Sequence, residues 1–138
     1  MSAKFNFNSQ VCTSKIQSER LLALGLKKET ADCCYQIAYL DCGLLKKCSP
    51  SLIPHNIIDG DRFIPAWSLH RLIEMMPFDV IPEGGFDNCF TLIKNYPKGC
   101  SVEYDGFSYY HKENIYDTLI DAIEHLIKEG YFNKEYLV

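Results

Sequence analysis

The chain has 138 residues, of which 47% are hydrophobic, and its 14 Lys+Arg against 18 Asp+Glu give a formal net charge of −4. This length fits a single domain over 1–138 and excludes a multi-domain enzyme. The negative charge disfavours non-specific binding to nucleic acid or to anionic membranes. No apolar run approaches a membrane span, and the first residues lack the apolar core of a signal peptide, so we expect a cytoplasmic protein without a membrane segment.

The first predicted element is a helix over Ser14–Leu24. Ser14 and Gln17 form a Ser-x-x-Gln capping box, in which each side chain satisfies a backbone amide at the start of the helix. Gly25 stands where a left-handed residue commonly ends a helix. We expect residues 1–12, which precede this helix, to be a flexible N-terminus.

A less regular region follows the first helix. We expect a short helix over Lys28–Cys33 and then a strand over Tyr35–Leu40, because the second run is rich in β-forming residues. Between 41 and 66 the chain carries so many Gly and Pro residues that a long irregular loop with short extended pieces is predicted. Loops of this length are often functional, although a plain cover over one side of the core is the simpler interpretation.

The pattern becomes helical again after Trp67. Ser68 is the natural N-cap, and Trp67 can pack on Leu72 as a hydrophobic staple. Pro77 ends the helix because proline cannot continue it. One face of this helix is apolar, so we expect it to lie on the core.

Three strands are predicted after a turn region over 78–86. They are Asn88–Lys94, Cys100–Tyr104 and Phe107–His111. The last two flank Asp105-Gly106, a dipeptide that favours a two-residue type I′ hairpin. The three strands together predict an antiparallel meander.

The last helix is the clearest element of the sequence. Asn114 caps it, Asp117 lies near its positive end, and Gly130 ends it. Its apolar residues cover one broad face, so the helix is strongly amphipathic. The fold class is therefore α+β: a three-stranded antiparallel meander packed with about four helices, including a long C-terminal amphipathic helix.

Seven cysteines raise the question of a metal site or a disulfide framework. The odd number and the absence of a signal peptide favour reduced thiols. Cys34, Cys42, Cys48 and His55 are the candidate zinc ligands, but none of their intervals has the Cys-x-x-Cys spacing of a structural zinc site. We therefore expect the cysteines to be small buried residues, with redox sensing as a lesser alternative, and we expect no cofactor.

Three blocks of the sequence resemble one protein family. They are Ser18-Glu-Arg-Leu-Leu-Ala-Leu-Gly-Leu26 with Thr30-Ala-Asp32, Ile64-Pro-Ala-Trp-Ser-Leu69 with 72–77, and Ala122-Ile-Glu-His-Leu-Ile-Lys-Glu-Gly130. The chain is similar in these blocks to small uncharacterised proteins of gut anaerobic bacteria and their prophages or other mobile elements. The resemblance implies a bacterial or phage accessory protein. It carries no known activity and no catalytic residue.

The chemical motifs are few, and we predict no catalytic residue. His70 with Glu74 and Asp121 with His125 are four residues apart on helices, a spacing that more often forms surface pairs than catalytic ones. A small thiol or imidazole enzyme stays an alternative, because a Cys–His pair can meet in space without a local motif. A second alternative is a DNA-binding regulator through a helix-turn-helix over 14–33, although the predicted second helix offers few basic residues and nucleic acid is therefore an improbable partner.

Aromatic residues are concentrated in the predicted hairpin and in the segment after Gly130. The candidates for an interaction surface are Tyr104, Tyr109, Tyr110, Tyr131, Phe132 and Tyr136. Tyrosine is favoured at protein interfaces, although these rings could equally fill the core of a small sheet. Our leading hypothesis is a non-enzymatic interaction module that binds a partner protein or a second copy of itself.

Overall fold

The structure is a computed structural model that describes residues 9–36, 38–39, 45–46, 50–52, 63–81, 88–95, 98–104 and 108–138. The chain folds as α+β, as the sequence predicts. Its elements in order are α1 (Lys15–Ala23), the 3₁₀ turn η1 (Lys28–Thr30), β1 (Cys33–Gln36), β2 (Ala38–Tyr39), β3 (Leu45–Lys46), β4 (Pro50–Leu52), β5 (Phe63–Ala66), α2 (Leu69–Met75), β6 (Asp79–Val80), β7 (Asn88–Lys94), β8 (Cys100–Tyr104), β9 (Ser108–Lys112), α3 (Ile115–Glu129) and the 3₁₀ turn η2 (Lys134–Tyr136).

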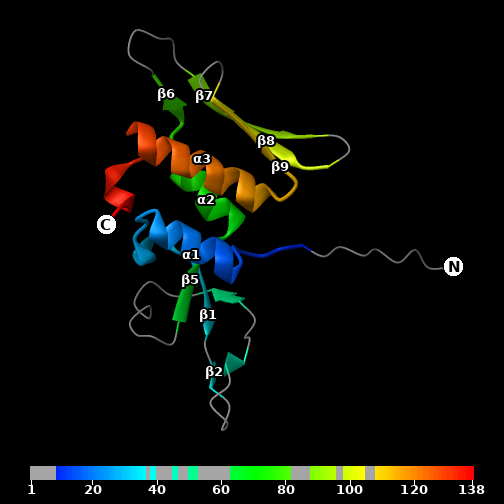
Figure 1. The fold of residues 1–138 in the computed structure, drawn as a ribbon, viewed down its shortest axis with the longest axis vertical. Coiled ribbons are helices and arrows are strands. Elements are labelled where there is room, and N and C mark those ends of the chain that lie inside the picture. Colours follow the sequence, from blue (N-terminus) through cyan, green and yellow to red (C-terminus); the bar gives the residue numbers. More distant parts are fainter. Residues whose placement is uncertain are drawn as a thin grey trace, which may run out of the picture.

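The strands form three antiparallel sheets. The largest has four strands in the order β6-β7-β8-β9, a second has the order β4-β1-β5, and β2 pairs with β3 alone. Figure 1 shows α3, α2 and α1 between the four-stranded sheet at the top and the small sheets at the bottom. The expected loop over 41–66 contains β3, β4 and β5 among its described residues.

The predicted meander is present but is only part of the sheet. β7 and β8 have the predicted bounds, and β6 adds a fourth strand that the sequence analysis assigned to a turn region. Tyr104 pairs with Ser108, so three residues separate the paired strands of the hairpin. The predicted two-residue turn would have paired Tyr104 with Phe107 and is therefore wrong in register; residues 105–107 lie outside the described residues.

Helix α3 begins and ends where the sequence predicts. The Asn114 side chain accepts hydrogen bonds from the backbone amides of Tyr116 and Asp117, and Gly130 has the left-handed φ of 81°. The amide of Tyr131 then donates to the carbonyl of Leu126 at 2.8 Å, which closes the helix end. The apolar face of α3 packs on β8 and β9 and forms much of the core.

Helix α1 also has the predicted caps. Both bonds of the Ser14–Gln17 capping box are present. Gly25 has a φ of 101°, and the amide of Leu26 donates to the carbonyl of Leu21 at 3.2 Å, so the chain reverses sharply after the helix. Cys12, in the segment expected to be flexible, is buried and forms an isolated bridge with Ser68.

The second helix predicted over 28–33 is wrong. Only the three-residue η1 forms, and β1 begins at Cys33, so the described residues contain three α-helices instead of about four. Long-range bonds hold this segment extended: Asp32 accepts from the amide of Ser68 at 2.8 Å, and the indole of Trp67 donates to the hydroxyl of Thr30 at 2.9 Å. These bonds outweigh a local helical preference, which is worth only tenths of a kcal/mol per residue.

None of the helices in the described part of the chain combines the length and the apolar character needed to cross a bilayer.

Candidate functional site

Five of the six candidate interface aromatics have described side chains, and these are buried or half-buried. Tyr104 and Phe132 are buried members of the main core, so neither offers area to a partner. The hydroxyl of Tyr104 donates to the carbonyl of Pro77 at 2.7 Å, and burial raises the pKa of this tyrosine. Both residues are core residues because α3 covers the sheet face on which Tyr104 lies and the segment after α3 folds back onto the protein.

The other aromatic candidates are half-buried where they are described. The ring of Tyr110 lies 5.7 Å from that of His125 on α3, measured between ring centroids. Tyr131 and Tyr136 pack against the core, with Tyr136 edge-on to Phe132. The side chain of Tyr109 lies outside the described residues.

The segment after α3 folds back onto the protein and pairs with the turn that follows α1. The amide of Lys27 donates to the carbonyl of Tyr136 at 2.8 Å, and the amide of Val138 donates to the carbonyl of Gly25 at 2.7 Å. Leu26 and Leu137 form an isolated antiparallel bridge between these two bonds. Backbone bonds therefore hold this segment to the turn after α1, while its aromatic side chains pack in or against the main core.

Only one of the four candidate zinc ligands lies among the described residues. Cys34 is buried on β1, while Cys42, Cys48 and His55 lie outside the described residues. Within the residues that the structure describes, no group of three His, Cys, Asp or Glu side chains could hold a metal ion.

Two of the described thiols, those of Cys12 and Cys33, are poor nucleophiles. Burial raises the pKa of Cys33 to about 12 and also raises that of Cys12, so both stay protonated near neutral pH. The thiol of Cys12 contacts the hydroxyl of Tyr35 at 3.6 Å, and that hydroxyl donates to the carbonyl of Thr13 at 2.8 Å. These contacts are those of a small structural cluster.

The histidines do not meet a cysteine in any of the three pockets described. His70 pairs with Glu74 at 2.6 Å on the exposed face of α2, as the four-residue spacing suggested. Asp121 accepts a hydrogen bond from Arg20 at 2.7 Å. No cysteine lines the three pockets.

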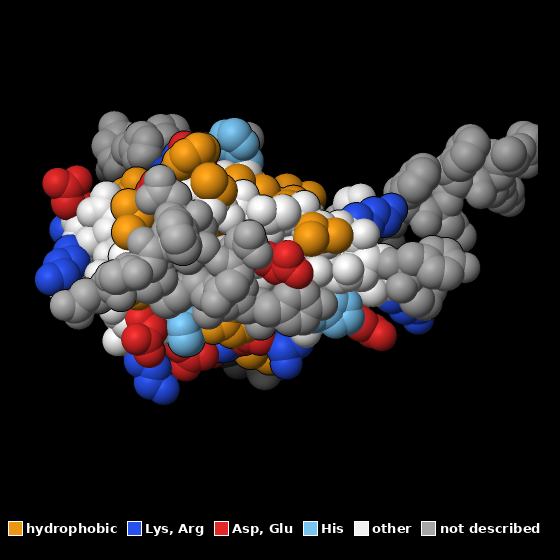
Figure 2. Space-filling model, turned by 90° about the horizontal axis from the view of Figure 1, so that it is seen from above, with side chains coloured by type: hydrophobic (Ala, Val, Ile, Leu, Met, Phe, Trp, Pro, Cys, Tyr) orange, Lys and Arg blue, Asp and Glu red, His pale blue; other side chains and the backbone are white. Residues whose placement is uncertain are grey.

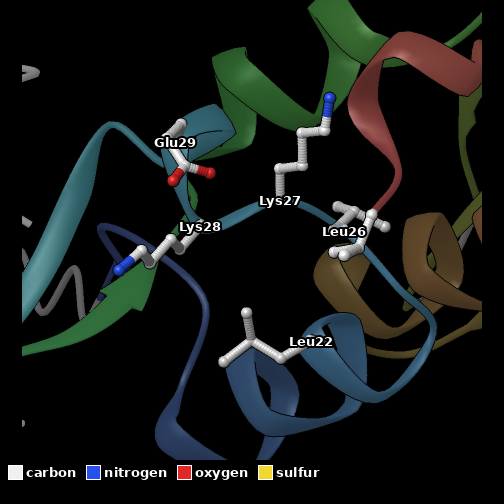
Figure 3. Close-up of a pocket in the computed structure, with 6 residues that line it drawn as sticks. Leu22, Leu26, Lys27, Lys28 and Glu29 are labelled. Atoms are coloured by element: carbon white, nitrogen blue, oxygen red, sulfur yellow. The ribbon is translucent and has the colours of Figure 1, made fainter.

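The feature that the sequence analysis missed is an apolar groove beside α1. It has a volume of about 800 Å³ and is lined by Leu22, Leu26, Lys27, Lys28, Glu29 and Val138. Figure 3 shows Leu22 across the opening from Lys27 and Lys28, with Leu26 to one side and the Lys27 side chain pointing away from Leu22. The groove exists because the chain reverses at Gly25 and the segment after α3 pairs with Leu26, which places aliphatic side chains from three segments around one opening.

Polar side chains line one side of this α1 groove. Lys27, Lys28 and Glu29 are exposed, whereas Leu26 is buried and Leu22 is 37% exposed. An opening of this size with an apolar floor and a few polar groups at its rim is typical of a binding site. The only sequence signals for it were the glycine after the first helix and the two lysines that follow.

A second group of exposed apolar side chains lies at the β6–β7 edge of the large sheet. Phe78 is 80% exposed, Ile81 56%, Leu92 37% and Ile93 38%. Figure 2, which views the molecule from the top of Figure 1, shows hydrophobic side chains reaching this face in several patches. No predicted interface residue belongs to this group.

Comparison of the chain with protein-family models, with curated proteins and with solved structures finds no match.

Proposed function

We propose that this chain is a non-enzymatic protein-interaction module whose α1 groove binds an apolar segment with acidic flanks on a partner protein. The observation that supports it is the groove itself, where Leu22, Leu26 and Val138 are apolar and the rim carries two lysines against one glutamate. The volume of about 800 Å³ lies within the range of ligand-binding sites. On the resemblance described above, the module serves as an accessory protein of a bacterium or of a mobile element.

The two alternative functions have no comparable support. A DNA-reading module needs a recognition helix, and the segment expected to supply it forms only η1. A thiol enzyme needs a thiolate, and the raised pKa values of Cys12 and Cys33 disfavour one at these two positions. The groove requires neither feature.

Charge complementarity selects the chemistry of the partner. Lys27 is exposed at the rim, and a carboxylate placed beside it would gain modest electrostatic energy and a faster, salt-sensitive association. The apolar floor would supply most of the affinity, since each buried aliphatic side chain contributes about 1.5–3 kcal/mol. A partner segment therefore needs both kinds of residue.

Selection from a displayed peptide library tests the proposal. We expect the selected peptides to combine aliphatic or aromatic residues with Asp or Glu, and to bind in fluorescence anisotropy with a dissociation constant in the micromolar range. Leu22→Ser should weaken binding at least tenfold, and Lys27→Glu several-fold, with a larger effect at low salt. Ile16→Ser is the matched control, because Ile16 is exposed on the same helix but does not line the groove.

Either of two results would contradict the proposal. One is that no peptide is enriched over a library control. The other is that peptides bind but Leu22→Ser and Ile16→Ser have equal effects, which would place binding elsewhere on the protein.

A further inference from the structure

Strand β7 is paired along most of its length on one side only. On the β8 side it pairs from Phe90 to Lys94. On the β6 side the ladder covers only Asn88 and Cys89, and one more bond follows, from the amide of Phe90 to the carbonyl of Phe78 at 2.9 Å. The rest of this edge has no strand partner among the described residues.

The free backbone groups of this edge follow from the alternation of a β-strand. Since the amide of Phe90 points toward β6, the amides and carbonyls of Leu92 and Lys94 lie on the same edge. The bond from the amide of Asn95 to the carbonyl of Gly99 at 3.0 Å agrees, because it places the odd-numbered residues on the β8 side. The open edge therefore presents two donors and two acceptors in the spacing of a strand.

The side chains around this edge are exposed as well. Thr91, Leu92, Ile93 and Lys94 are all exposed, on both faces of the sheet. Phe78 and Ile81 add apolar surface beside them. An uncovered strand edge with apolar flanks is a template for another strand, and proteins usually cover or shorten such edges.

We propose that this edge pairs with the same edge of a second copy, antiparallel and centred on Ile93. In this register Leu92 lies opposite Lys94 of the second copy, and the two residues exchange both backbone bonds, which gives four bonds in total. Each lysine faces a leucine, so no like charges are opposed. The two-fold register needs only one kind of chain, as closed dimers do.

The neighbouring register is blocked by the fold itself. A dimer centred on Leu92 would place Lys94 of the second copy opposite Phe90. The amide of Phe90 already donates to the carbonyl of Phe78. A dimer centred on Lys94 would oppose two lysines, so the Ile93 centre both keeps the Phe90 bond and avoids like charges.

The expected dimer is weak. A ladder of three residues with a few apolar side chains buries roughly several hundred Å² per copy, which is the range of transient interfaces. We therefore expect a dissociation constant of about 100 μM, and monomers in dilute solution. This interface is separate from the α1 groove, so its test does not depend on the proposed function.

Sedimentation equilibrium from about 10 μM to about 1 mM, together with site-specific cross-linking, tests the proposal. Leu92→Pro removes a donor on the open edge, which an edge strand tolerates, and should abolish the dimer while the circular dichroism spectrum is retained. Leu22→Ser, in the groove, should leave the dimer unchanged.

Cross-linking examines the register without relying on the proline. Ile93→Cys should form an intermolecular disulfide under diamide, because directly opposed residues of a non-hydrogen-bonded pair lie about 4.5 Å apart between Cα atoms. Thr91→Cys is the matched control: its thiol lies on the same face but about 13 Å from its counterpart, and it should give no more cross-link than the wild type. The wild type supplies the background from Cys89, which is exposed on the same strand.

Three outcomes would overturn the proposal. One is a protein that stays monomeric at about 1 mM. The second is equal cross-linking of Ile93→Cys and Thr91→Cys. The third is a monomer whose edge binds an extended peptide in a manner sensitive to Leu92→Pro, which would assign the edge to a foreign strand.

Discussion

Replacement of Thr13 by valine should destabilise the fold by about 2–4 kcal/mol. Thr13 is fully buried, and its Oγ1 accepts a hydrogen bond from the amide of Trp67 at 3.0 Å and shares another with the hydroxyl of Ser18 at 2.7 Å. Valine preserves the shape but leaves both partners unsatisfied, and each buried orphan costs about 1–3 kcal/mol. We take the lower part of the summed range because the hydroxyl of Ser18 can turn to the carbonyl of Ser14.

Thr13→Ser is the matched variant for this prediction. It retains the hydroxyl and loses one methyl group, which should cost about 1 kcal/mol. Urea unfolding followed by the fluorescence of Trp67, the only tryptophan, and by circular dichroism gives both values. Equal losses in the two variants would refute the reasoning, because the methyl group and not the hydrogen bonds would then account for the effect.

A second substitution examines the same network. If the orphaned hydroxyl of Ser18 contributes to the loss, Ser18→Ala should be almost neutral in the Thr13→Val background and destabilising in the wild type. Additive effects of the two substitutions would show that the pair is not coupled.

Two further predictions concern the turns and the thiols. Gly25→Ala should lower the free energy of unfolding, measured in urea, by about 1 kcal/mol, since nothing lies near the added Cβ. Gly99→Ala should lower it by at least about 3 kcal/mol, because its Cβ would lie 2.6 Å from the carbonyl oxygen of Lys112. Equal costs would contradict this difference in packing. Because burial raises the pKa of Cys33 from its ordinary 9.0 to about 12, its contribution to stability is fully present below about pH 9 and is lost as the pH rises toward 12. Urea midpoints should therefore fall across this window, with a smaller slope in Cys33→Ala, and an unchanged slope would refute the assignment.

The elements predicted well are those whose signals are local. The caps of α3 at Asn114 and Gly130, and the capping box of α1, depend on residues within one or two turns of each other. The bounds of β7 and β8 likewise follow from short runs of β-forming residues between turn residues.

The missed elements depend on distant contacts. β6 has two residues and no pattern of its own; it is a strand only because Asp79 and Val80 meet Cys89 and Asn88. The segment expected to be a second helix is held by Trp67 and Ser68, more than thirty residues away. No local pattern reports contacts of this kind.

The candidate surface was difficult to predict for a related reason. Tyrosine and phenylalanine suit a core as well as an interface, and only the packing of α3 and of the segment after it placed Tyr104 and Phe132 inside. The groove arises from Leu22, Leu26 and Val138, which are separated by more than a hundred residues at their extremes. Single aliphatic residues in a sequence do not indicate which of them will be exposed together.

The bonds that join the segment after α3 to the turn after α1 also affect the kinetics of folding. The amide of Lys27 and the carbonyl of Tyr136 are 109 residues apart, and Thr13 bonds to Trp67 across 54 residues. Closing such long loops is entropically unfavourable, so we expect these contacts to form late, after the local structure of α3 and the β7–β9 meander. The α1 groove is built from the late contacts, and it should therefore be the first part of the protein to open during unfolding and the first to exchange its amide hydrogens with solvent.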